Sequence, residues 1–269
     1  MVMLKALPTD DSIGVNATAL QISQSGKSNS TNPGQVSVLP ISLNANPELW
    51  SYTGRTGPEN WATLSPNYTI CAIGKLQSPI NVFPEKNAKM EQNVLTGVYS
   101  PIETHNGDDK YIYYPIINSG SANSANSSNH IIHGSKSYDM YSVGLKAPSE
   151  HYLENKEYPL EIQINHKNND GTWLNIGVLV EIGNHTSDFI AMYFKNQGIQ
   201  LMAFDGILRD LDEYSLTYRY SGSMTVPPCT ESVTWFITYR KLSITATDLQ
   251  RFDSVMGRLR PLQRYTSSF

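Results

Sequence analysis

Residues Leu174–Ile182 read Leu-Asn-Ile-Gly-Val-Leu-Val-Glu-Ile, a nearly continuous apolar run. A strand that is buried on both faces has this pattern, whereas a half-buried strand alternates apolar and polar residues. The alternating pattern occurs in Leu160–Ile164, and β-branched and aromatic residues dominate Tyr111–Ile117 and Thr234–Tyr239. Pro, Gly, Asn and Ser separate these segments, as they do between strands. The chain is therefore predicted to form a mostly β domain around a central strand at 174–182.

Helical patterns are few and short. We expect helices at Asp188–Asn196, Gly206–Leu211 and Ala246–Met256, the last with Thr245 or Thr247 as its N-cap. The sequence contains no internal repeat, and 269 residues is an ordinary size for one all-β domain.

The first 48 residues differ from the rest in composition. Ser23–Gln35 is rich in Ser, Asn, Gly and Gln and has no apolar periodicity, so it cannot bury much surface. We expect an N-terminal arm over residues 1–48, through which a protein partner could bind, and a domain over residues 49–269. Met1–Thr9 has no apolar core of signal-peptide length.

The overall charge is mildly acidic, with a formal net charge of −4 and a pI near 5.9. This balance does not favour nucleic acid or an anionic membrane as a partner. No apolar run reaches the roughly 20 residues of a membrane span.

Two cysteines, Cys71 and Cys229, are separated by more than half of the chain. Such a pair is either two buried thiols or one long-range disulfide. Asn-X-Ser/Thr sites also occur in polar stretches, some of them expected by chance in a Ser- and Asn-rich chain. These candidate glycosylation sites are Asn16, Asn29, Asn67, Asn126 and Asn184.

Several short motifs follow one another between residues 49 and 264, and in this order they resemble the α-class carbonic anhydrase family. They are Gln77-Ser-Pro-Ile-Asn81, Ala147-Pro-Ser-Glu-His151, the stretch Tyr218–Glu231 with its Pro-Pro-Cys, and Arg260-Pro-Leu-Gln263. The resemblance implies a large, twisted, mostly antiparallel sheet with an active-site cone at its centre. It also implies a disulfide between Cys71 and Cys229, because secreted members often join the corresponding cysteines.

Carbonic anhydrase is the standard example of a three-histidine zinc site, whose bound water has its pKa lowered to about 7. Aligned without gaps on Pro148–His151, the three ligand positions carry Gly144, Lys146 and Gln163 here. Gly has no ligand atom, Gln is a poor zinc donor, and the Lys ammonium repels a cation. We therefore expect these former metal positions to bind no metal and the protein to need no cofactor.

Other positions of the family's mechanism are partly kept. The Thr that orients the zinc hydroxide corresponds to Thr225, and the Glu that accepts its proton corresponds to Glu150; we expect them to persist as a buried hydrogen-bonded pair. The usual proton-shuttling His is replaced by Ser121. The apolar wall that receives carbon dioxide carries Asn165 and Asn175 instead.

The histidines outside these positions offer little for a relocated metal site. His130 and His133 lie three residues apart, a spacing that a helix would align and an extended chain would not. His151 and His166 match family positions outside the metal shell, and we expect both to form hydrogen bonds in the core.

These observations lead to the expectation of a catalytically inactive carbonic-anhydrase-like protein, not an enzyme, that serves as a binding module or as a structural subunit of an assembly. One alternative is a weakly active carbonic anhydrase or esterase with a relocated metal site. Another is a glycan-binding surface adhesin, although the acidic total disfavours a basic glycan-binding patch. The cysteines and glycosylation sites suggest an oxidising compartment: extracellular, secretory or an organelle lumen.

Overall fold

The computed structural model describes residues 50–92, 94–99, 102–104, 113–115, 129–195, 200–202 and 216–265. All of them lie in the second of the two units into which the chain divides, Ala45–Phe269. The predicted arm and its boundary after residue 48 therefore lie outside the described residues.

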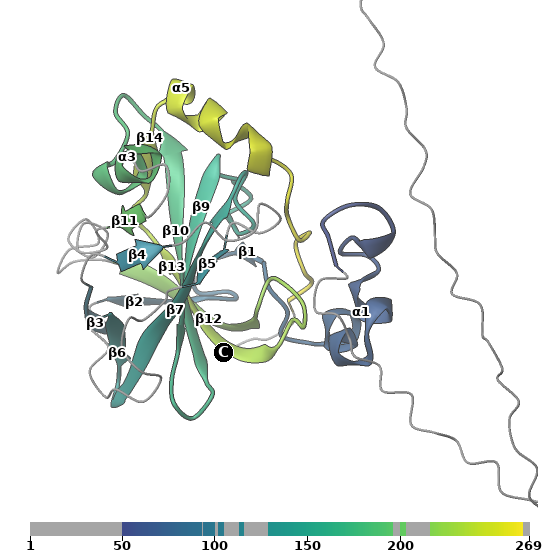
Figure 1. The fold of residues 1–269 in the computed structure, drawn as a ribbon. Coiled ribbons are helices and arrows are strands. Elements are labelled where there is room, and N and C mark those ends of the chain that lie inside the picture. Colours follow the sequence, from purple (N-terminus) through teal and green to yellow (C-terminus); the bar gives the residue numbers. More distant parts are fainter. Residues whose placement is uncertain are drawn as a thin grey trace, which may run out of the picture. The chain divides into compact units, whose positions relative to one another are not determined.

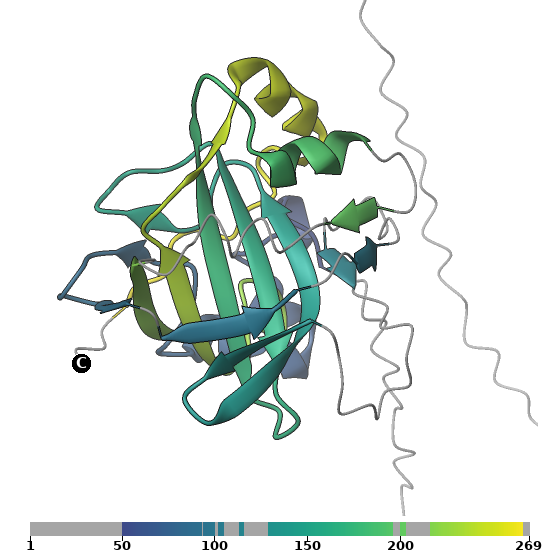
Figure 2. The same cartoon turned by 90° about the vertical axis from the view of Figure 1, so that its left-hand side faces the viewer.

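One large, curled sheet organises the described residues (Figures 1 and 2). Its strands are β2 (Lys89–Gln92), β3 (Leu95–Val98), β5 (Tyr113–Pro115), β6 (His130–His133), β7 (Lys136–Lys146), β9 (Leu160–Lys167), β10 (Trp173–Ile182), β12 (Leu216–Ser223), β13 (Glu231–Thr238) and β14 (Leu242–Ile244). The order across the sheet is β2-β12-β13-β10-β9-β7-β6-β3, with β14 beside β10 and β5 beside β7. Neighbouring strands are antiparallel except β10–β13 and β10–β14, which are parallel.

Two strand pairs lie outside this sheet. The first joins β1 (Asn81–Val82) to β8 (Tyr152–Leu153) in parallel, and the second joins β4 (Ile102–Thr104) to β11 (Gln200–Met202) in antiparallel fashion. The predicted fold class, a large, twisted and mostly antiparallel sheet, is confirmed.

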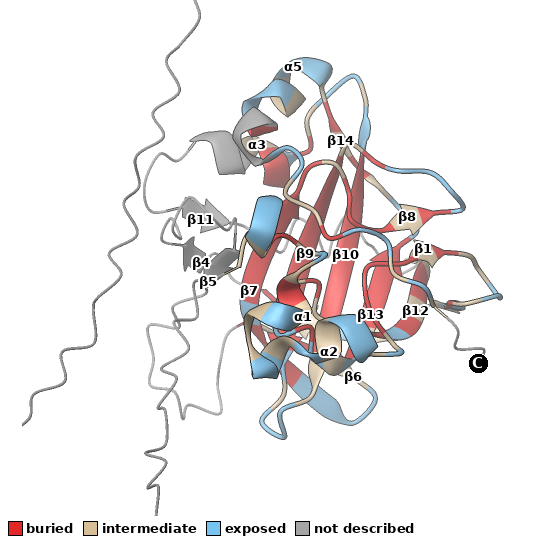
Figure 3. Ribbon diagram, turned by 90° about the vertical axis from the view of Figure 1, so that its right-hand side faces the viewer, coloured by how far each residue is buried: buried red, intermediate tan, exposed pale blue. Residues whose placement is uncertain are grey.

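Strand β10 lies in the middle of the sheet, and its residues 174–180 are buried on both faces, as the apolar run predicts (Figure 3). Glu181 and Ile182, at the end of the run, are exposed. Ile176 and Val178 belong to the hydrophobic cluster on one face, and Leu179 belongs to the cluster on the other. The residues of β10 that share the face of Leu179 include Asn175, which brings a polar side chain into the interior.

The other strand predictions are confirmed where the structure describes them. Leu160–Ile164 forms the first part of β9, and Thr234–Tyr239 overlaps β13. Of the predicted strand Tyr111–Ile117, residues 113–115 form β5 and the remainder lies outside the described residues.

The helices are short: η1 (Gly54–Thr56), α1 (Trp61–Leu64), η2 (Pro66–Tyr68), α2 (Ile70–Ile73), α3 (Asp188–Lys195), α5 (Ala246–Leu249) and η3 (Gln250–Val255). The predicted helix Ala246–Met256 is one α-helical turn that continues as a 3₁₀ helix, and Thr245 caps it by accepting a hydrogen bond from the Asp248 backbone. The prediction Gly206–Leu211 lies outside the described residues. Within the described ranges, no helix is long and apolar enough to cross a membrane.

A disulfide joins Cys71 in α2 to Cys229 in the turn after β12, as the resemblance implies. Its presence is compatible with an oxidising compartment. Arg260 reinforces the same region, because its guanidinium donates to the Cys71 carbonyl (3.0 Å), the Ser78 carbonyl (2.7 Å) and Gln77 Oε1 (2.8 Å). Burial lowers the pKa of Arg260 to about 10, although the charge of Glu150 opposes that shift; the guanidinium remains charged at neutral pH.

His166 is fully buried and forms two hydrogen bonds in the core, as expected. Its Nδ1 lies 3.1 Å from the Leu174 carbonyl, which can only accept, so Nδ1 carries the proton. Its Nε2 therefore accepts from the Tyr99 hydroxyl at 2.6 Å. Burial raises the pKa of Tyr99, which keeps this donor protonated, and lowers the pKa of His166 to about 4.

Removal of the disulfide should destabilise the protein strongly. The bond closes a loop with a sequence separation of 158, and the chain-entropy model gives such a loop about 5 kcal/mol. We expect the Cys71→Ala/Cys229→Ala double variant to unfold at lower urea concentration than the wild type. A reducing agent should lower the midpoint of the wild type and leave that of the double variant unchanged. Equal urea midpoints for the wild type and the double variant would contradict a stabilising role of the disulfide.

His166 should make stability depend on pH below neutrality. An unfolded histidine has a pKa of about 6.5, whereas folded His166 has one of about 4, so between these values only the unfolded chain takes up this proton. The contribution of neutral His166 to the free energy of unfolding is therefore complete above about pH 6.5. It is lost as the pH falls to about 4, and the loss amounts to about 3 kcal/mol at most. Urea unfolding of wild type and His166→Gln between pH 4 and 7 measures this. The free energy of unfolding should fall less steeply in the variant, and parallel curves would refute the assignment.

Candidate functional site

Strands β7 and β9 form the floor of the candidate site. They pair antiparallel, with Gly144 opposite Gln163 and Lys146 opposite Glu161. The three positions that the resemblance assigns to metal ligands, Gly144, Lys146 and Gln163, therefore lie together on adjacent strands, because residues two apart on a strand share a face.

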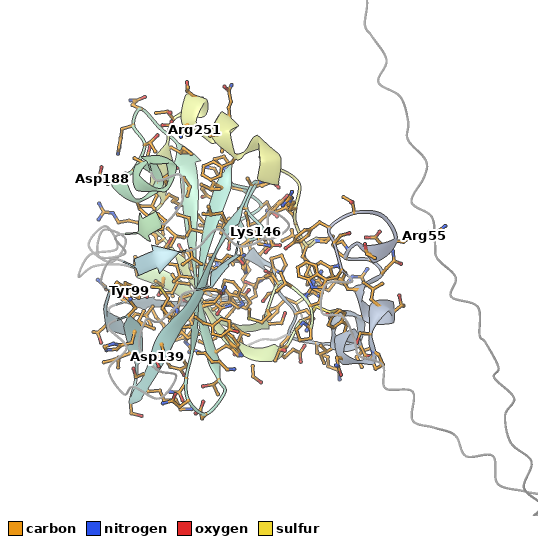
Figure 4. All side chains as sticks on the ribbon, viewed as in Figure 1. Arg55, Tyr99, Asp139, Lys146, Asp188 and Arg251 are labelled. Atoms are coloured by element: carbon orange, nitrogen blue, oxygen red, sulfur yellow. A yellow bond between two sulfur atoms is a disulfide. The ribbon has the colours of Figure 1, made fainter. Side chains whose placement is uncertain are left out.

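Lys146, labelled in Figure 4, is buried, with 3% of its surface exposed. Its Nζ donates to Glu150 Oε1 at 3.0 Å and to the Tyr52 hydroxyl at 2.8 Å. The Nζ atom also lies 4.9 Å from the centre of the Tyr52 ring, a cation–π distance. The ammonium is thus both paired and hydrogen-bonded.

Glu150 is the carboxylate around which the floor is assembled. Besides Lys146, it accepts from Gln163 Nε2 at 3.0 Å and from the Arg260 backbone N–H at 2.9 Å. Only 2% of its surface is exposed. Three donors satisfy this buried carboxylate, as a buried charge requires.

Thr225 joins the same cluster indirectly. Its hydroxyl donates to Gln163 Oε1 at 3.3 Å, and Gln163 in turn donates to Glu150. The expectation of a direct hydrogen bond between Thr225 and Glu150 was therefore wrong. Gln163 stands between the two side chains because it is long enough to reach both.

A second buried layer lies beside the floor. His151 Nδ1 is 2.7 Å from Glu161 Oε1 and its Nε2 is 2.6 Å from the Tyr220 hydroxyl, so His151 forms the expected core hydrogen bonds. Burial alone would raise the pKa of Glu161, but the charge of His151 and the hydrogen bonds from His151 and Gln163 hold it below its usual value. Glu161 is therefore an ionised carboxylate.

The side chains at the floor do not fit zinc. Zinc sites in proteins use thiolate, imidazole and carboxylate ligands in a tetrahedral arrangement. Gly144 has no side-chain ligand, Lys146 is an ammonium in an ion pair, and both polar atoms of Gln163 are engaged in hydrogen bonds. The described residues also hold no group of three or more His, Cys, Asp or Glu side chains that could bind a metal elsewhere. His130 and His133 lie on strand β6, where a spacing of three puts them on opposite faces.

The next pair of facing positions along β9 and β10 is polar. Asn165 and Asn175 pair across β9 and β10 and are 1% and 0% exposed. Asn165 Nδ2 donates to Ser142 Oγ at 3.0 Å, and Asn175 Nδ2 lies 3.6 Å from Met224 Sδ. Neither Oδ1 atom has a hydrogen-bond partner. A buried polar group without a partner costs about 1–3 kcal/mol, so these two amide oxygens are unfavourable for stability.

Several predicted positions lie outside the described residues: Ser121, Asn16, Asn29 and Asn126. Asn67 and Asn184 are described and exposed, and are therefore accessible for glycosylation. Sequence reasoning assigned no role to Tyr52, Ser142 or the Arg260 backbone in this site. Their contacts bridge 94, 23 and 110 residues, a range over which no local pattern carries a signal.

Comparisons with known proteins give a consistent result. The model of the family described as eukaryotic-type carbonic anhydrase matches residues 56–263. A carbonic anhydrase of Pectobacterium atrosepticum is 28% identical over 225 residues, 80% of this chain and 86% of that protein. One of Klebsiella pneumoniae is 29% identical over 242 residues, 85% and 92% of the two chains. The structure of an α-carbonic anhydrase from Thermovibrio ammonificans, in complex with sulfanilamide, covers 80% of this chain and 95% of that one at 27% identity, with a TM-score of 0.68.

These comparisons contradict the expectation that the chain is no enzyme and serves as an inactive binding module or structural subunit. The relatives are named carbonic anhydrases, and nothing in the comparisons shows a loss of activity. The expectation was wrong because it inferred a loss of activity from three side chains alone, Gly144, Lys146 and Gln163. The family model covers most of the described unit, and the chain belongs to the eukaryotic-type carbonic anhydrase family.

Proposed function

We propose that this chain acts on carbon dioxide and bicarbonate, the substrate pair of carbonic anhydrases, and that its cone binds bicarbonate. The observation that carries the proposal is the pair of buried amide oxygens, Asn165 Oδ1 and Asn175 Oδ1, that have no hydrogen-bond partner. Most buried polar atoms in native proteins have a partner, so two neighbouring exceptions support a bound hydrogen-bond donor.

The two amides lie next to the floor. Asn165 is two residues from Gln163 on β9, and Asn175 is two residues from Gly177, which pairs with Gln163. Alternation along the strands puts all four residues on one face of the sheet. The unpartnered oxygens are therefore one step along the strand pair from the Lys146–Glu150 cluster.

Bicarbonate suits this arrangement better than carbon dioxide does. Carbon dioxide has no hydrogen-bond donor, whereas the hydroxyl of bicarbonate can donate to an amide oxygen. Its charged oxygens favour the side of the cone that holds the Lys146 ammonium, because hydrogen bonds to ionised groups are stronger than neutral ones. Gln163, Thr225 and Glu150 hold one another in place and so keep that ammonium positioned.

We further propose that the protein resides outside the cytosol, in an extracellular, secretory or organelle-lumen compartment. The disulfide and the exposed sites Asn67 and Asn184 support this. A protein partner bound through residues 1–48 stays a prediction.

Bicarbonate should raise the melting temperature of the wild type in a concentration-dependent way, since a ligand of the folded state stabilises it. The double variant Asn165→Val/Asn175→Val should be more stable without bicarbonate, because the unpartnered oxygens are gone, and should not respond to it. Thr238→Val is the matched control, because Thr238 is also fully buried and its hydroxyl also has no partner. Its side chain lies on the opposite face of the sheet from Asn175, since Asn175 pairs with Trp235 and residues three apart on a strand face opposite ways. It should respond to bicarbonate like the wild type. Chloride at the same ionic strength should give no shift.

Stopped-flow carbon dioxide hydration tests the reaction itself. We expect a rate above that of buffer with the purified chain. The rate should be lower with the Asn165→Val/Asn175→Val variant, because the transition state that leads to bicarbonate loses the same hydrogen-bond acceptors. A rate equal to buffer, together with no bicarbonate-dependent change in melting temperature, would overturn the proposed function.

A further inference from the structure

We infer that the Lys146 ammonium supplies the positive charge among Gly144, Lys146 and Gln163, and that it excludes a divalent metal from these three positions. The inference concerns how the floor is held together. It does not depend on bicarbonate binding, which the experiments above test separately.

The first support is the concentration of negative charge at the floor. Glu150 and Glu161 are both buried, at 2% and 0% exposure, and the Gln163 amide donates to both, at 3.0 and 3.1 Å. Two carboxylates this close require compensating cations. Lys146 forms an ion pair with Glu150 at 3.0 Å, whereas His151 Nδ1 lies 2.7 Å from Glu161 Oε1, so the ammonium of Lys146 supplies the positive charge beside Glu150.

The second support is the chemistry of the ligand positions. In a three-histidine site the metal provides the positive charge and the protein provides neutral nitrogen ligands. Here the protein provides the charge itself, through Lys146, and Gly144 and Gln163 provide no nitrogen ligand for a metal. A divalent ion at this position would lie against an ammonium that is 3% exposed and cannot withdraw into solvent.

The third support is that Lys146 has a further attachment. Its bond to the Tyr52 hydroxyl connects the floor to a cluster of aromatic rings, in which Trp50, Tyr52 and Trp61 pack edge to face with centroids 5.2 to 5.8 Å apart. The ammonium therefore joins the sheet to the segment before α1. A zinc ion held by the two strands alone would make no such connection.

The first experiment measures metal content. The purified 269-residue chain, dialysed and then incubated with zinc chloride, should retain less than about 0.1 zinc per chain, and a chelator should leave its melting temperature unchanged. The variant Gly144→His/Lys146→His/Gln163→His restores three neutral nitrogen ligands; it should retain about one zinc per chain and melt lower when the chelator is present. About one zinc per wild-type chain, released by Gln163→Ala, would overturn the inference.

The second experiment tests the charge and holds even where the triple variant fails to fold. Lys146→Met leaves Glu150 buried without its cation and should lower the melting temperature, and Lys146→Met/Glu150→Gln should recover part of that loss. Lys146→Arg is the conservative control, and it should keep more stability than Lys146→Met. The tryptophan fluorescence spectrum should shift in Lys146→Met, because the Tyr52 attachment is lost. A Lys146→Met variant as stable as the wild type, with an unchanged spectrum, would show that the ammonium has no such role.

Discussion

The carboxylate of Glu150 is the group on which the described site depends. It accepts hydrogen bonds from the Lys146 ammonium, the Gln163 amide and the Arg260 backbone. Such a buried charge is stable only when it is paired and hydrogen-bonded. Its donors come from β7, β9 and the C-terminal segment, so one side chain connects parts of the chain up to 110 residues apart. Tyr52 and Thr225 join this group through Lys146 and Gln163.

The two faces of the sheet differ in what they bury. One face carries an apolar cluster that includes Ile164, Ile176 and Phe236, and the other carries a second one that includes Leu179 and Trp235. Both stabilise the sheet through burial of apolar surface. The second face differs in that it also places Asn165 and Asn175 in the interior, each with an amide oxygen that has no partner. Violations of local stability rules tend to mark functional sites. The proposed bicarbonate site therefore explains Asn165 and Asn175 better than folding does.

Family membership and ligand chemistry describe different properties of this chain. The family match spans residues 56–263, and the curated relatives cited above are named carbonic anhydrases. The side chains at Gly144, Lys146 and Gln163 concern one position in that fold. An ammonium carries a single charge and its hydrogen bonds are directed at Glu150 and Tyr52. A buried ammonium at this position favours an anion over a second cation.

Local pattern was sufficient for the parts of this protein that depend on near neighbours. The apolar run Leu174–Ile182 determined a strand buried on both faces, and Thr245 determined a helix start, because hydrophobic burial and capping act over a few residues. The order of short motifs determined the family and the disulfide pairing. Only the tertiary structure decided that Gln163 separates Thr225 from Glu150, that Lys146 binds Tyr52, and that the oxygens of Asn165 and Asn175 have no partner. These contacts join distant segments in directions set by the twist and register of the sheet, and the free energy of a buried polar group depends on the full set of atoms around it, which no stretch of sequence contains.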